Sequence, residues 1–141
     1  AFLQGQPAYD VHVLSPEDCL SLGGMDFSFT AMRHPVPTLG ISAQEGTRRF
    51  FFTGDTNEMD GLAELITGAD ILLCNAGLLE RDWTPASPHL SVARAAGLAA
   101  GCRGTVVLTH LSPFYTRQQI EEEALPLCPH ARLARAMDTY A

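Results

Sequence analysis

The chain has 141 residues, of which 46% are hydrophobic and 18% are charged, so it suits one folded domain with a sizeable core and not a disordered protein. Its net charge of −7 disfavours a broad nucleic-acid-binding surface. No apolar run approaches the roughly 18 residues that cross a membrane, and the start shows no signal-peptide pattern. The four cysteines form no Cys-x-x-Cys pair, which disfavours a zinc knuckle, and we expect a protein of the reducing cytoplasm.

The first half of the chain predicts short strands joined by turns. Apolar and polar residues alternate from Met25 to Met32, which is typical of a half-buried strand, and Pro35 prevents the strand from continuing. Residues 44–47 have the composition of a hairpin turn, and the three aromatic residues at 50–52 favour a pleated core strand. The expected strands are 11–14, 25–32, 39–43 and 50–52, after an irregular start over residues 1–10.

The second half predicts strands and helices in alternation. Gly68 ends a run of apolar residues at helical spacing, and Ser91 is placed to cap an alanine-rich helix. The three glutamates at 121–123 indicate a solvated helix face. The expected helices are 59–66, 92–100 and 117–124, and the expected strands are 70–75, 105–109 and 131–136, with an irregular loop over 76–90. This alternation predicts an α/β fold.

Three residues that can bind metals each stand just beyond a predicted strand: His34, Asp55 and His110. If the three strands are neighbours in one sheet, their side chains emerge at the same edge. Asp55 taken alone could equally cap the following helix, act as a general base or bridge two metals. Two imidazoles and one carboxylate together form a set that zinc or another transition metal binds.

Four segments resemble, in order and spacing, the later metal motifs of the metallo-β-lactamase fold, and the branch they resemble most is the ribonuclease Z-like one. The segments are RHPVPTLGI over 33–41, TGDT over 53–56, PHLS over 88–91 and LTHLS over 108–112. The resemblance covers about residues 24–140. A Gly-Asp-Thr triplet alone is a weak signal, whereas its spacing to the two later histidines makes the combination strong.

The resemblance implies a role for each matching residue. His34 would bind a first metal ion, Asp55 would bridge two ions, and His110 would bind the second. His89 would lie beside the scissile phosphate and assist proton transfer without binding a metal. The implied cofactor is a pair of divalent ions, zinc first with manganese or iron as alternatives, which generates a hydroxide nucleophile near neutral pH.

The family's His-x-His-x-Asp-His motif, which supplies four ligands, has no match in this sequence. The resemblance therefore implies that residues 1–141 form a single partial domain, the C-terminal half of an αββα sandwich, with a mixed sheet and helices on one face. Three ligands are too few to hold two ions tightly. We expect a metal-dependent hydrolase as the full-length protein and an inactive, or nearly inactive, chain in isolation.

The expected substrate is a small-molecule ester or phosphodiester. In the tRNA-processing branch a long arm that grips tRNA separates the residues that match His34 and Asp55, whereas here only residues 35–54 separate them, so tRNA is not the expected substrate. A lactone or thioester hydrolase on the same fold is one alternative. Another is a non-catalytic chain that associates with itself or with a partner and so covers the exposed face of the sheet.

Two residues in or next to the loop over 76–90 have more than one possible role. Trp83 could line the pocket or serve packing. Asn75 stands where ribonuclease Z relatives often carry a glutamate that orients the histidine matching His89.

Overall fold

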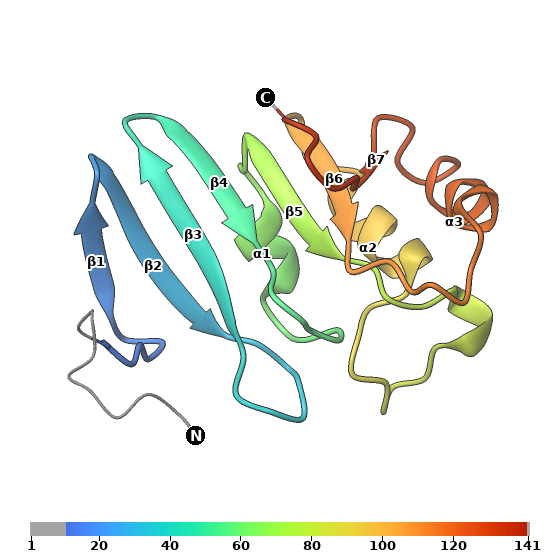
Figure 1. Ribbon diagram of the computed structural model, residues 1–141, viewed down its shortest axis with the longest axis horizontal. Helices are drawn as coiled ribbons and strands as arrows, with labels where there is room; N and C mark the ends of the chain where they lie inside the picture. The colour runs from blue at the N-terminus through green and yellow to red at the C-terminus, as the bar shows by residue number, and fades with distance from the viewer. Residues whose placement is uncertain (1–10, 141) are drawn as a thin grey trace, which may run out of the picture.

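The computed structural model describes residues 11–140, and within them seven strands form one sheet in chain order (Figure 1). The expected irregular start over residues 1–10 lies outside this range. The strands are β1 Cys19–Leu22, β2 Met25–Ala31, β3 Leu39–Glu45, β4 Arg48–Phe52, β5 Ile71–Asn75, β6 Thr105–Thr109 and β7 Arg132–Leu133. The helices are α1 Leu62–Ile66, α2 Val92–Ala99 and α3 Arg117–Ala124, with a short 3₁₀ helix, η1, at Glu80–Asp82.

The sheet is mixed because its connections change halfway along the chain. Strands β1 to β4 pair antiparallel, and β1–β2 and β3–β4 are hairpins whose turns contain Gly23, Gly24 and Gly46, all with positive φ. Strands β4 to β7 pair parallel through connections that carry α1, α2 and α3. As a result, the C-terminal ends of β2, β4, β5 and β6 meet at one edge of the sheet.

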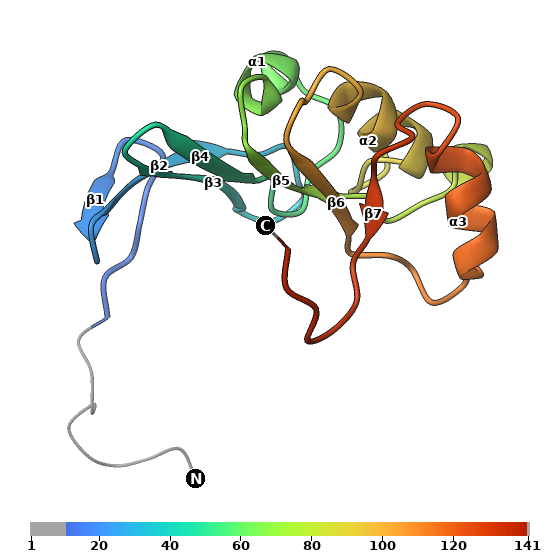
Figure 2. The ribbon, with the colours of Figure 1, turned by 90° about the horizontal axis from the view of Figure 1, so that it is seen from above.

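The core lies between the sheet and the helices. Alternate residues of β4, β5 and β6 point to this side and are almost completely buried, among them Phe51, Leu72 and Val106. Each contributes roughly 1.5–3 kcal/mol by burial. Helix α2 meets them with small side chains, including Ala95 and Ala99, so that it packs closely. Helices α1 and α2 cover the same face of the sheet, and α3 packs against α2 (Figure 2).

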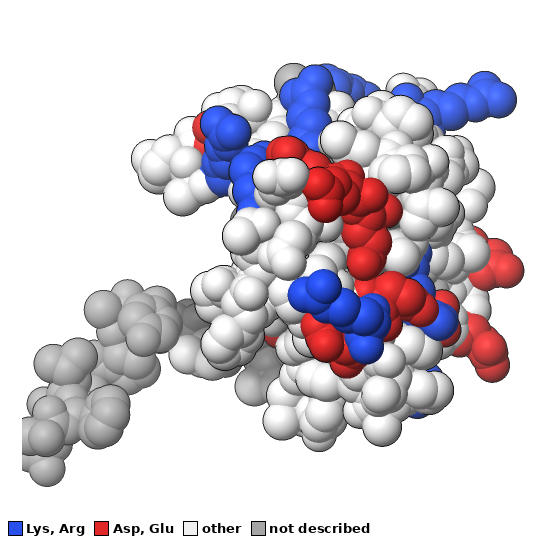
Figure 3. All heavy atoms as spheres, turned by 90° about the vertical axis from the view of Figure 1, so that its right-hand side faces the viewer, with Lys and Arg blue, Asp and Glu red and all other residues white. Residues whose placement is uncertain are grey.

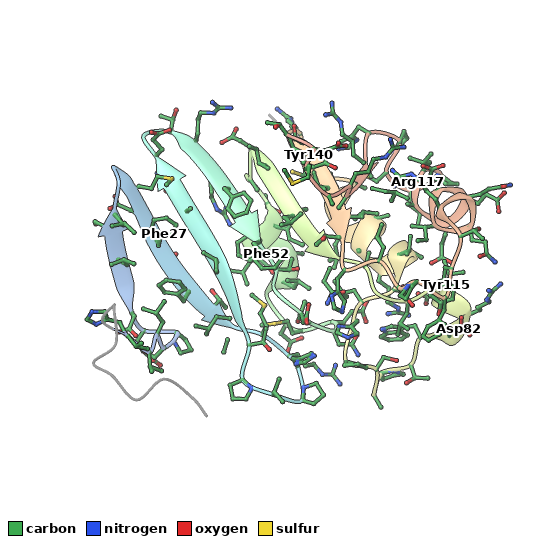
Figure 4. All side chains as sticks on the ribbon, viewed as in Figure 1. Phe27, Phe52, Asp82, Tyr115, Arg117 and Tyr140 are labelled. Atoms are coloured by element: carbon green, nitrogen blue, oxygen red, sulfur yellow. The ribbon has the colours of Figure 1, made fainter. Side chains whose placement is uncertain are left out.

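The opposite face of the sheet is apolar, and most of its side chains are only half-buried, although Phe29, Ala43 and Val107 on this face are buried. Phe50 is paired with Ile71 across β4 and β5, and Phe52 is paired with Leu73. Phe52 and Phe27 lie on strands that none of the helices in residues 11–140 covers from this side (Figures 2 and 4). Tyr140, from the chain after β7, lines one pocket together with Phe50 and Ile71.

Two predictions were wrong in detail. Residues 11–14 form no strand, because the free edge of β2 is taken by β1, which the tight turn at Gly23 and Gly24 places next to β2.

Glu123 is not a freely solvated charge. Its carboxylate accepts hydrogen bonds from the backbone N–H groups of Glu80, at 2.9 Å, and Ala93, at 3.0 Å, and so joins α3 to η1 and to the start of α2.

The other expected helices and strands are confirmed, with bounds that differ by at most three residues. The Ser91 cap is confirmed too, since its Oγ accepts the N–H of Arg94 at 3.1 Å. In residues 11–140 no helix is long and apolar enough to cross a membrane. The cysteines are free thiols, three of them buried and Cys19 exposed.

The glycine before Asp55 yields a prediction about stability. Gly54 has a φ of 59°, and a Cβ there would stand 2.7 Å from the carbonyl oxygen of Leu39. Gly54→Ala should therefore lower the free energy of unfolding by roughly 2–5 kcal/mol, from backbone strain and overpacking together. Chemical denaturation measures the loss.

Gly46→Ala is the matched control, because Gly46 has a similar φ of 57° and no atom within 4 Å of the added carbon. It should lose only the strain, about 1–2 kcal/mol. Equal losses for the two variants would show that the close approach to Leu39 does not matter.

Candidate metal centre

The three residues predicted to bind metal lie together at the edge where the strands end. His34 follows β2, Asp55 follows β4 and His110 follows β6. A carboxylate oxygen of Asp55 lies 3.6 Å from Nδ1 of His110. The ring of His89, from the loop after η1, lies between the other two imidazoles, with ring centroids 5.4 Å from His34 and 4.5 Å from His110. The structure thus brings together all four residues singled out from the sequence.

Asp55 owes its position to the two residues before it. Thr53 is fully buried and continues the ladder of β4, since its N–H bonds the carbonyl of Leu73 at 3.0 Å. Its hydroxyl accepts the N–H of Asn75 at 3.0 Å. Gly54 then turns the chain with its positive φ, and Asp55 projects half-exposed from the end of the strand.

His110 is held in a strained conformation. Its φ of 58° is in the left-handed region, which costs a non-glycine residue about 1–3 kcal/mol. The residue before it is anchored, because the carbonyl of Thr109 accepts the N–H of Ala76 at 2.9 Å. Such strain persists where the surrounding structure imposes it, and it clusters at functional sites.

His34 is oriented by its neighbour Thr38. The Thr38 hydroxyl lies 3.3 Å from Nδ1 of His34 and 3.0 Å from the carbonyl of Val36. The Val36 N–H is 3.5 Å from the same ring nitrogen, at the limit of a hydrogen bond, so the Thr38 contact dominates. When Thr38 donates to the carbonyl, its oxygen can accept the proton of Nδ1, and Nε2 of His34 is left with a lone pair for a metal.

His89 is partly buried. Gly77 lies beneath it, where an added Cβ would be 3.0 Å from the Cβ of His89. Burial lowers the pKa of His89, and the neighbouring charges of His110 and His34 lower it further, whereas Asp55 opposes them. The imidazole is therefore more readily neutral than a free histidine.

Asn57 ties together the segments that carry these residues, a role that the sequence analysis missed. Its side chain is buried, with 1% exposed. Its amide nitrogen donates to the carbonyl of Ser87 at 2.6 Å and to that of Pro85 at 3.2 Å. Its own N–H bonds the carbonyl of Arg33 at 2.9 Å. Its position directly after Gly-Asp-Thr was the only available signal, since nothing local indicates partners so distant in sequence.

Of the two roles considered for Trp83, the structure shows the packing role. Its ring N–H donates to Oδ1 of Asn57 at 2.9 Å, and the Arg94 guanidinium lies 3.4 Å from the ring centroid. Arg94 also pairs with Glu80 and Glu58, and its hydrogen bonds are the main cause of the lowered pKa of Glu80. This network fastens the loop before His89 to helix α2.

The segment after His110 is fastened to the same loop. The Tyr115 hydroxyl donates to the Asp82 carboxylate at 2.8 Å, and the two residues lie side by side in Figure 4. Burial is the main cause of the raised pKa of Tyr115. Around this end of the molecule, Figure 3 shows acidic side chains gathered beside arginines and no continuous basic surface on the face in view.

These residues fit a divalent metal ion. The ligand atoms of His34 and Asp55 lie within 4.8 Å of each other, and an atom of His89 lies equally near. The predicted ligand His110 is not part of this group and joins it through Asp55, 3.6 Å away. Among the described residues the Asp55 carboxylate receives no hydrogen bond, and its one ion-pair partner is His110. Imidazole nitrogens and a carboxylate are the ligands that zinc and related ions prefer. By contrast, Cys74 is fully buried and its pKa is raised to about 12, so its thiol takes no part.

Comparisons with known proteins place the chain in a family. Residues 1–111 match the family model of the β-lactamase superfamily domain. A ribonuclease Z from Bradyrhizobium sp. (strain ORS 278) is 40% identical over 107 residues, which are 74% of this chain and 35% of the relative. The chain therefore spans about a third of the length of that curated relative.

Two solved structures share the fold. The metallo-β-lactamase fold protein YhfI from Bacillus subtilis superposes with a TM-score of 0.79 at 21% identity, over 87% of this chain and 52% of its own. The short form of human tRNase Z superposes with a TM-score of 0.56 at 28% identity, over 67% of this chain and 39% of its own.

Thr38 provides a test of the way His34 is oriented. Thr38→Val keeps the shape of the side chain and removes its oxygen. In the full-length protein it should weaken metal binding about 10–100-fold, because the second partner of a ligating imidazole fixes its orientation. Competition with a chelating dye measures this affinity. Thr47→Val, in the exposed turn after β3, is the control, and equal affinities for both variants would contradict the role of Thr38.

The lowered pKa of His89 predicts a dependence of stability on pH in the metal-free protein. The unfolded chain protonates this histidine near its ordinary pKa of about 6.5, whereas the folded chain keeps it neutral to lower pH. Its contribution is therefore fully present above about pH 6.5 and is lost as the pH falls through the folded pKa. His89→Gln should show a smaller loss of unfolding free energy on acidification in denaturant titrations.

His12→Gln, on an exposed residue outside the site, serves as the control and should follow the unmodified protein. If His89→Gln follows the same pH profile as this control, burial of His89 contributes nothing to the pH dependence.

Proposed function

Since the chain belongs to the metallo-β-lactamase superfamily and is ribonuclease Z-like within it, we propose that the full-length protein is a metal-dependent hydrolase that acts on phosphodiesters. The observation that carries the proposal is the convergence of His34, Asp55 and His110 on one edge of the sheet, with His89 between the imidazoles. Two relatives of the chain are ribonuclease Z proteins from Bradyrhizobium strains, which supports phosphodiesters as the substrate class.

Each residue has a distinct proposed role. His34 and His110 would hold a first and a second divalent ion, and Asp55 would contribute its two carboxylate oxygens to holding both. Zinc is the first choice, and manganese or iron are alternatives. Bound divalent ions supply Lewis-acid stabilisation and a nucleophile at neutral pH. His89 lies at the site as the catalytic group that contacts the substrate without binding metal.

We propose that residues 1–141 are part of a larger sandwich domain. The half-buried apolar face of β2 to β5, with Phe50 and Phe52, is suited to cover by a second layer. That layer would carry the remaining metal ligands, because three ligands cannot complete two sites. On this proposal the isolated chain is inactive, and association with a second copy of itself is the alternative way to cover the face. The four free cysteines suit the reducing cytoplasm.

The proposed substrate is a small phosphodiester and not tRNA. The segment between His34 and Asp55 is the β3–β4 hairpin, whose tight turn at Gly46 and Thr47 carries no inserted arm. The net charge of −7 also disfavours a long polyanion.

Hydrolysis by the full-length protein tests the proposal. Bis(p-nitrophenyl) phosphate should be cleaved, a chelator should abolish cleavage, and added zinc or manganese should restore it. Asp55→Asn should lower the rate of hydrolysis at least about 100-fold. The substitution weakens a metal ligand directly, whereas loss of a residue that only orients a ligand costs about 10–100-fold. Asp60→Asn, an exposed carboxylate with no contact to the site, is the matched control. Rates of p-nitrophenol release provide the measurement.

The same assay separates the alternatives. Faster cleavage of a lactone or a thioester would replace the proposed substrate class, and efficient trimming of precursor tRNA would overturn the argument from the short hairpin. Absence of any metal-dependent hydrolysis would favour a non-catalytic chain. In that case, the mass of the 141-residue chain in solution should show self-association.

A further inference from the structure

Asn75 connects the end of β5 to His89 through a single nitrogen. Its side chain is completely buried. The amide nitrogen, Nδ2, lies 3.1 Å from Nδ1 of His89 and 3.4 Å from the carbonyl oxygen of Thr56. The amide oxygen is buried and has no hydrogen-bond partner among the described residues. All the hydrogen bonds of this side chain are therefore made by its NH₂ group.

The neighbouring carbonyl decides the direction of the bond to His89. A backbone carbonyl oxygen can only accept, so the atom of Asn75 that faces Thr56 must be the donor nitrogen. Turning the amide over would place two oxygens against each other and leave a buried NH₂ group without an acceptor, which costs more than an unpartnered oxygen. Nδ2 therefore donates, and Nδ1 of His89 accepts.

We propose that Asn75 is a positioning residue that holds His89 in the tautomer with its hydrogen on Nε2, so that His89 donates a hydrogen bond to an anionic oxygen of the substrate and does not bind metal. The part about substrate rests on the proposed function, whereas the tautomer stands on the hydrogen bonds alone.

The tautomer separates two roles that position alone leaves open. His89 lies close enough to His34 and Asp55 to join them as a ligand. A ring nitrogen that carries hydrogen has no lone pair for a metal, and Nδ1 is already occupied by Asn75. Nε2 has no protein partner among the described residues, so its N–H is available to a ligand. Oxygens that gain negative charge during phosphoryl transfer are the acceptors that such a donor stabilises.

The residue type at position 75 sets the direction of the hydrogen bond to Nδ1 of His89. A carboxylate at this position could only accept, so it would draw the hydrogen to Nδ1 and leave Nε2 with a lone pair, as in a base or a metal ligand. An amide does the reverse. The sequence departure at Asn75 thus alters the chemistry of His89 and does not merely weaken its support.

Nitrogen-15 NMR of the histidine rings tests the tautomer directly. The full-length protein is labelled at histidine and studied above the pH range in which histidine titrates, with the His89 signals assigned by their loss in His89→Gln. We expect Nδ1 of His89 without hydrogen and Nε2 with hydrogen. Asn75→Asp should reverse this pattern, whereas Gln44→Glu, the same change on the exposed part of β3, should leave it unchanged.

A His89 ring with its hydrogen on Nδ1 in the unmodified protein would overturn the proposal, even if no variant folds. Asn75→Ala, which removes the donor without adding charge, should give a mixture of both tautomers, and a ring unchanged in this variant would show that Asn75 does not control it.

Inorganic phosphate probes the donor role in the metal-loaded protein. The Nε2 hydrogen of His89 should move downfield as phosphate binds, and an unmoved signal at saturating phosphate would overturn the role as donor. These readouts need no turnover. An inactive protein with the expected tautomer would contradict the proposed function alone, and an active protein with the opposite tautomer would contradict the role of Asn75 alone.

Discussion

The site depends on the hydrogen bonds of one buried amide, Asn57. Its Oδ1 accepts the ring N–H of Trp83 and the backbone N–H of Glu58, and its nitrogen reaches carbonyls of the loop that leads to His89. A buried polar group left without a partner costs about 1–3 kcal/mol. Moving this loop away would leave the amide nitrogen of Asn57 without hydrogen bonds, so that cost holds the loop in place. Asp55 lies two residues away on the same segment. The distance between Asp55 and His89 is thus set by a polar contact that is separate from the metal ligands.

Near the hydrogen bonds of Asn57, the backbone adopts strained conformations that a sheet edge with a purely structural role would avoid. Gly54 and His110 both have positive φ, and only the first is a glycine. The left-handed conformation of His110 is maintained because Thr109 is anchored in β6 and bonded to Ala76. The buried core between the sheet and α2 supplies the rigidity, since close-packed side chains cannot adjust to relieve strain at the edge.

Elements with a strong local pattern could be predicted, and those that depend on distant partners could not. The central runs at 71–74 and 106–108 are apolar throughout, so their burial was evident. Residues 11–14 had a strand-like composition but lost their place to β1, a competition that no local pattern reveals. Glu123 looked like its solvated neighbours, and only the packing of α3 against α2 placed its carboxylate beside two backbone N–H groups.

For the site, the sequence by itself determined which residues could bind metal and that each stands just beyond a strand, because residue type and alternation are local properties. Tertiary structure alone decided that the strands are neighbours, that Asp55 and His110 pair, and that Asn75 donates to His89. The direction of that last hydrogen bond depends on the carbonyl of Thr56, which comes from another strand end. Contacts of this kind join residues far apart in the chain, so they exist only once the sheet has formed.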